Sequence, residues 1–149
     1  MDRTALFVAA RKGHVSVMKL LLQFQANIDA VGERGRSILQ EAAKQRHVEV
    51  VRLLLQHGAN VEIKNVDGWT PLHETAFVGS MVICELLVGA GARTLTTDLA
   101  NRTPLDIANA RSHLEISEYL ADHQEREGAE QTSDHQSNRH ESNEGPLPV

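Results

Sequence analysis

Apolar residues recur along the chain with a period of 33 residues, and no insertion or deletion separates the copies. Two positions show this most clearly, one holding Leu6, Leu39, Leu72 and Leu105 and the other holding Val17, Val50, Ile83 and Ile116. In each copy a short apolar segment precedes a second one, such as VVRLLL at 50–55, and this spacing indicates two helices. The pattern predicts four stacked copies of a helical hairpin.

Residues that start and stop helices occur at fixed places in the copies. Thr70 and the proline after it are typical of a helix N-terminus, because the hydroxyl accepts an amide hydrogen and proline is tolerated at the first helical position. Ser37 with Gln40 predicts a capping box. Gly79 ends the first helix of its copy and Gly58 ends the second, since a left-handed cap is least costly without a Cβ. The unit is predicted as helix, tight turn, helix and protruding turn.

Two copies lack a glycine at these ends. Gln25 stands where Gly58 stands in its own copy, and Arg46 stands where Gly79 does. If the left-handed geometry is kept, each side chain costs roughly 1 kcal/mol relative to glycine.

The first and last copies differ in polarity. Ser117 occupies the position of Met18 and Val51, which predicts a solvent-facing side for the terminal repeat. The first copy keeps apolar residues such as Val17 and Phe24. We expect one of three explanations for this: the first layer is covered by its own helices, it continues a longer array, or a partner docks on it.

Charge divides the chain into two parts. Residues 1–121 carry 13 acidic and 13 basic side chains, whereas residues 122–149 carry 7 acidic and 2 basic ones. Residues 122–149 contain no aromatic residue, and we expect this acidic tail to be disordered. It either keeps the array soluble or folds back over the binding face and competes with a ligand. The array is predicted to comprise repeats at about 1–33, 34–66, 67–99 and 100–121.

The neutral array gives no general attraction for nucleic acid or for a membrane surface. No segment approaches the roughly 20 apolar residues that span a bilayer. Cys84 is the single cysteine and lies in an apolar run, so we expect a buried, inert thiol. We expect an intracellular protein, cytoplasmic or nuclear.

The sequence contains no motif typical of catalysis, neither a nucleotide-binding loop nor HExxH nor GxSxG. His14, His47 and His113 recur at one repeat position after the helix break, which favours a structural role. We therefore expect no enzymatic activity, no cofactor and no metal site.

DGWTPLHETAFVGS at 67–80 and LLLQHGANVEIKNVDGWTPLH at 53–73 resemble ankyrin repeats, and the resemblance covers residues 1–121 in four copies. It implies an all-α solenoid of stacked helix-turn-helix units joined by protruding β-turns. It also implies that the histidine of TPLH, His73, is structural. The resemblance further implies a non-catalytic protein–protein interaction module whose concave face binds a partner protein.

Carrying the binding pattern of the family across predicts a partner site on turn tips and first helices. Trp69 and Phe77 with nearby arginines have the composition of an interface hot spot, and we expect a partner segment of acidic and apolar character. The alternative is that Trp69 only packs on the neighbouring turn and Phe77 covers the end of its helix. The predicted site comprises Arg34, Arg36, Lys44, Trp69, Glu74, Phe77, Arg102 and Arg111. We expect a monomer acting as an adaptor or inhibitor. The alternative is a targeting fragment of a larger enzyme or signalling protein.

Overall fold

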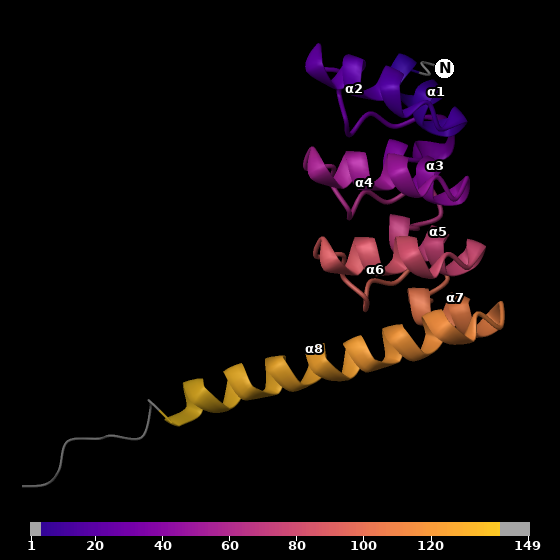
Figure 1. The fold of residues 1–149 in the computed structure, drawn as a ribbon. Coiled ribbons are helices and arrows are strands. Elements are labelled where there is room, and N and C mark those ends of the chain that lie inside the picture. Colours follow the sequence, from indigo (N-terminus) through magenta and orange to yellow (C-terminus); the bar gives the residue numbers. More distant parts are fainter. Residues whose placement is uncertain (1–3, 141–149) are drawn as a thin grey trace, which may run out of the picture.

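The structure, a computed structural model, describes residues 4–140, and side chains as far as residue 130. Four layers are stacked in one direction, and each contributes two antiparallel helices (Figure 1). The helices are α1 (Ala5–Lys12), α2 (Val15–Gln23), α3 (Ile38–Lys44), α4 (Val48–Gln56), α5 (Pro71–Val78), α6 (Met81–Gly89), α7 (Pro104–Ala110) and α8 (Leu114–His140), with a short 3-10 turn, η1, at Glu33–Gly35. Among the described residues no β-strand is formed, and the predicted all-α solenoid is confirmed.

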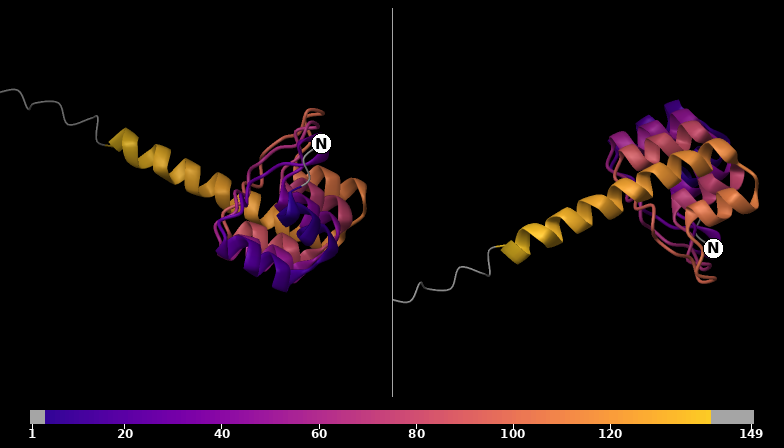
Figure 2. Two further views of the ribbon diagram at one scale, coloured as in Figure 1. Left: turned by 90° about the horizontal axis from the view of Figure 1, so that it is seen from above. Right: turned by 90° about the horizontal axis from the view of Figure 1, so that it is seen from below.

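The first helices α1, α3, α5 and α7 pack against one another in one row, and α2, α4, α6 and α8 form the second row (Figures 1 and 2). The loops between layers project from the stack in the same direction, as the views along the stack show (Figure 2). None of the described helices is long and apolar enough to cross a bilayer.

The predicted caps begin the first helix of each layer. The Thr4 hydroxyl accepts the Phe7 N–H at 3.2 Å in α1. Ser37 and Gln40 form a reciprocal pair, in which the Ser37 N–H donates to the Gln40 side-chain oxygen at 2.9 Å. These bonds satisfy amide groups that a helix N-terminus leaves unpaired, and so the sequence determines where each hairpin starts.

Both predicted glycine-free ends keep the left-handed conformation, with φ of 59° at Gln25 and 58° at Arg46. The histidines after the helix break join adjacent layers. His47 Nε2 bonds with the Arg11 carbonyl at 3.0 Å, and His113 Nε2 bonds with the Phe77 carbonyl at 3.1 Å. The structural role predicted for this histidine position is confirmed at both of these layers.

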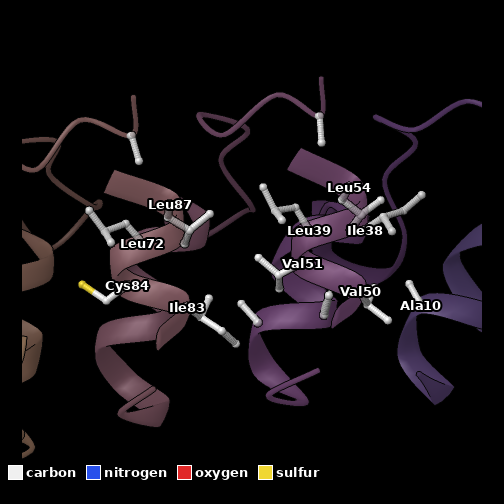
Figure 3. Packing of buried hydrophobic residues seen from close by; sticks show 14 of the residues in the cluster. Ala10, Ile38, Leu39, Val50, Val51, Leu54, Leu72, Ile83, Cys84 and Leu87 are labelled. Atoms are coloured by element: carbon white, nitrogen blue, oxygen red, sulfur yellow. The ribbon is translucent and has the colours of Figure 1, made fainter. Parts of the chain in front are cut away.

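The core is a continuous column of aliphatic side chains between the two rows (Figure 3). Leu54, Leu72 and Leu87 are fully buried in it, and burying such a side chain stabilises the fold by about 1.5–3 kcal/mol. Cys84 lies in the same column, and burial raises the pKa of its thiol to about 12. The prediction of a buried, unreactive thiol agrees with this position.

The outer surface of the first layer is apolar and exposed. Val17 is 47% exposed, whereas Val50 at the same repeat position is 1% exposed because α2 covers it. Phe24 is also exposed. At the other end of the stack the prediction for Ser117 is wrong, because this residue is buried and its hydroxyl donates to the His113 carbonyl at 3.0 Å.

The tail differs from the disorder predicted from residue 122, since α8 continues as a helix to His140. The first turns of α8 pack on the array, so the unfavourable free energy of helix nucleation is already offset. Each further turn then adds only the smaller free energy of helix elongation. Contacts to the preceding layer continue past residue 122: the Thr94 hydroxyl donates to Glu127 at 2.8 Å, and the Gln124 amide donates to the Thr94 carbonyl at 3.3 Å. The end of α8 then projects beyond the stack (Figure 1), and residues 141–149 lie outside the described residues.

Candidate partner-binding groove

A groove of about 540 Å³ is lined by α3 and α5, the first helices of the second and third layers, and by the turns that lead into the second, third and fourth layers. We call it the turn–helix groove. Its lining consists of Arg36, Lys44, Asn65, Asp67, Trp69, Glu74, Phe77, Asp98, Leu99, Ala100 and Arg102. Six of the eight residues predicted as a partner site are in this lining. The other two contact lining residues: Arg34 donates to Asp67, and Arg111 lies over the ring of Phe77.

Two residues that the sequence reasoning missed, Asn65 and Asp98, build the turns that form the groove. Asn65 Oδ1 accepts the N–H groups of Asp67 and Trp69 at 2.9 and 3.0 Å. Asp98 Oδ1 accepts those of Ala100 and Arg102 at 2.9 and 2.8 Å in the next copy. The signal was present in the sequence, since Asn and Asp at the start of a turn bond to the backbone two residues on.

Asp98 also connects the third layer to the fourth. Its Oδ2 accepts the Trp69 indole N–H at 3.0 Å and the Arg102 guanidinium at 2.9 Å, and its side chain is 1% exposed. Burial disfavours the charged carboxylate, but the backbone and side-chain bonds from Arg102 and the bond from Trp69 outweigh it and lower the Asp98 pKa. Trp69 is thereby held in one orientation at the groove.

Aromatic side chains form the apolar part of the groove. The rings of Trp69 and Phe77 have centroids 5.5 Å apart and are tilted by 54°. The Arg111 guanidinium lies over the Phe77 ring at 4.3 Å, a cation–π arrangement. Phe77 remains 39% exposed and Leu99 80% exposed, so an apolar surface faces outward.

Most of the basic residues predicted for this surface already have acidic partners within the chain. Arg34 donates to both carboxylate oxygens of Asp67 at 3.1 Å. Arg36 pairs with Glu41 at 3.3 Å and Arg102 with Asp98 at 2.9 Å. The positive charge that we expected to attract an acidic segment is therefore largely compensated, leaving Lys44 and Arg111 without an acidic partner in the described part of the chain.

His73 connects the start of its own helix to the turn of the next layer beside the groove. Its Nδ1 accepts the Thr70 N–H at 3.1 Å, and its Nε2 bonds with the Arg102 carbonyl at 3.0 Å. Burial lowers the His73 pKa, so the ring is neutral in the folded state at neutral pH. Gln40 occupies the same repeat position one layer earlier and donates to the Trp69 carbonyl at 2.6 Å. The structural role implied by the resemblance is consistent with these bonds.

Glu74 lies in the groove lining with a side chain that is almost completely buried. Burial raises the pKa of its carboxyl, although the charges of Arg36 and Lys44 act in the opposite direction. Over residues 4–130, no group of three or more His, Cys, Asp or Glu side chains has a geometry that could hold a metal ion.

A scan against protein families matches the family described as ankyrin repeats (3 copies) at residues 1–65 and 60–134. No curated protein matches the chain at a significant level. The two matched segments together span most of the chain, including every layer described above. The chain therefore belongs to the ankyrin-repeat family.

Proposed function

We propose that the chain is a protein-binding module that holds a partner along the turn–helix groove and acts as an adaptor or as an inhibitor that occludes its partner. Ankyrin repeats in general mediate protein–protein interactions and are not catalytic. The observation that carries the proposal is the exposed apolar surface formed by Phe77 and Leu99 beside Trp69. Contiguous exposed apolar surface bordered by charged groups is typical of protein interaction sites.

The rigidity of this surface supports the proposal. Trp69 is held by its indole bond to Asp98, and Phe77 is held between Trp69 and Arg111. Preorganised aromatic side chains lose little conformational entropy on binding, so they contribute strongly to affinity.

Affinity capture from native lysate followed by mass spectrometry tests the proposal. The bait is compared with a variant carrying Phe77→Ser and Leu99→Ser, because both side chains are exposed and their loss leaves the core intact. A matched control carries Leu20→Ser on α2 and Phe24→Ser at its C-cap, which removes exposed apolar side chains of the same kind from the first layer, outside the groove. We expect a specific partner to be lost from the groove variant and retained by the control.

A targeting segment within a larger enzyme or signalling protein is the second candidate, and the exposed face of α2 favours it. Val17 stands at a position that is buried in every later layer, where the preceding layer covers it. This face is suited to pack against a further repeat or another domain. A partner lost with the α2 control but retained by the groove variant would favour this second candidate and contradict the first.

A further inference from the structure

One repeat position holds acidic residues in the middle layers and apolar residues in the outer ones. Val8, Glu41, Glu74 and Ile107 are successive members of this position, each 33 residues after the last. Glu41 and Glu74 are each 4% exposed, so both residues are largely buried at a place where the fold accepts an aliphatic side chain. A buried carboxylate is unfavourable unless a cation or hydrogen-bond donor compensates it.

Three side chains of the chain itself compensate the negative charge of the Glu41 carboxylate. Arg36 Nη1 lies 3.3 Å from Oε2, and the Gln45 amide donates to Oε1 at 3.1 Å. Arg11 of the preceding layer lies 3.6 Å from Oε1. The acidic residue and its donors therefore form a closed structural group.

Glu74 stands at the same place but has no such direct bonds among the described residues, and the charges of Arg36 and Lys44 act on it only from a longer distance. The counterparts of Arg36 and Gln45 in its layer are Trp69 and Val78, neither of which is positioned as a donor to the carboxylate. The counterpart of Arg11 is Lys44, which lines the groove without an ion pair to Glu74. In the part of the chain that the structure describes, no side chain forms a hydrogen bond or ion pair with the Glu74 carboxylate.

The open space beside Glu74 is the turn–helix groove, and the rings that border it suit the aliphatic stem of a long side chain. Trp69 replaces the arginine of the equivalent position, so an aromatic ring stands where the second layer supplies its own cation. Phe77 replaces Lys44 of the preceding copy in the same way. The third layer thus combines a buried carboxylate with two rings, and such rings attract cations as well as alkyl groups.

We propose that Glu74 is the specificity-determining residue of the groove and binds a lysine or arginine side chain of an extended partner segment, whose stem packs against Trp69 and Phe77. The proposal rests on the proposed function and names the chemistry of the partner. The incoming cation supplies from the groove the direct ion pair that Arg36 supplies to Glu41 in the preceding layer. Lys44 competes with it for the same carboxylate.

Four degenerate pools of fluorescently labelled nonapeptides provide the test, with lysine, arginine, norleucine or glutamate fixed at the central position and mixed residues elsewhere. Fluorescence polarisation measures binding, and quenching of Trp69, the single tryptophan of the chain, reports binding at the groove. We expect the lysine and arginine pools to bind about tenfold more tightly than the norleucine pool, as one partly desolvated ion pair provides. The glutamate pool binds most weakly.

Two variants assign the preference to Glu74. Glu74→Gln keeps the size of the side chain and removes its charge, so the lysine and arginine pools should then bind no better than the norleucine pool. Glu49→Gln makes the same change on the outer surface of α4, where the side chain is 74% exposed, and should leave the preference intact. Lys44→Met removes the competing cation and should strengthen binding of the basic pools severalfold.

A preference for norleucine or glutamate would overturn the inference, as would an undiminished lysine preference in Glu74→Gln or failure of all four pools to bind. Weaker binding of the basic pools to Lys44→Met would also contradict it. These outcomes are independent of the capture experiment. If a partner is lost from the variant with Phe77→Ser and Leu99→Ser, the proposed function is still supported even when the peptides show no preference for a basic residue. Folding of each variant is checked by its circular dichroism, and Ile107 at the equivalent position shows that the site accepts an uncharged side chain.

Discussion

Replacing Asp98 by asparagine tests how the groove is held together, because one carboxylate oxygen of Asp98 serves donors from two repeats. Oδ2 accepts the indole N–H of Trp69 and the guanidinium of Arg102 at 3.0 and 2.9 Å. An asparagine can keep its carbonyl on the turn amides that Oδ1 now accepts. Its NH2 group then faces Trp69 and Arg102, which are both donors, so neither bond can form.

The cost follows from the two lost bonds. The indole donor is left unpaired in a part-buried place, which costs about 1–3 kcal/mol. Arg102 is half exposed and can turn to water, so the loss of its pair adds at most about 1 kcal/mol. We expect Asp98→Asn to lower the free energy of unfolding by roughly 1–4 kcal/mol.

Urea unfolding followed by Trp69 fluorescence and by circular dichroism measures this change. The fluorescence of the folded variant should also shift, since the indole loses its carboxylate partner. Asp67→Asn is the matched control, because Asp67 and its partner Arg34 are both more than half exposed. A surface pair contributes little, so we expect a change within about 0.5 kcal/mol for the control. Equal losses in both variants would refute the reasoning from burial.

Three further predictions concern the scaffold. Gly79→Ala should destabilise the fold, because Gly79 has φ +80° and a Cβ there would lie 2.5 Å from the His113 ring; thermal unfolding measures it, and an unchanged midpoint would contradict the packing. Gln25→Gly should raise stability by roughly 1 kcal/mol, since Gln25 keeps φ 59°, and a lower melting temperature would show that its side chain stabilises this end. The lowered pKa of His73 means that the unfolded chain binds a proton more readily, so stability should fall as pH drops below the ordinary histidine value of 6.5. His73→Gln, which gives the third layer the side chain that Gln40 provides in the second, should reduce this slope between pH 7 and 5, and an identical slope would show that other groups cause it.

The repeat period and the helix starts were predictable from the sequence because they depend on local interactions. A threonine or serine bonds to an amide three residues away, and Thr4 and Ser37 do so wherever the layers lie. The left-handed conformation of Gln25 and Arg46 was predictable because the corresponding positions in other copies hold glycine. The burial of Cys84 followed from the apolar periodicity of its helix.

The charges of the groove were decided by the tertiary structure. Arg34 meets Asp67 and Arg102 meets Asp98 only when the turns fold and the layers stack, so the predicted basic surface is mostly paired. The helix beyond residue 122 likewise contacts Thr94 of the preceding layer, through bonds that composition alone does not reveal.

By itself, the sequence determined the family, the number of layers and the places where the first helix of each layer begins, since these depend on residues a few positions apart and on a regular repeat. Only the stacking decided which charged side chains remain available, because an ion pair between layers depends on atomic distances. Glu41 and Glu74 occupy the same place in the repeat, yet the first is bonded by three side chains and the second faces the groove without a partner among the described residues.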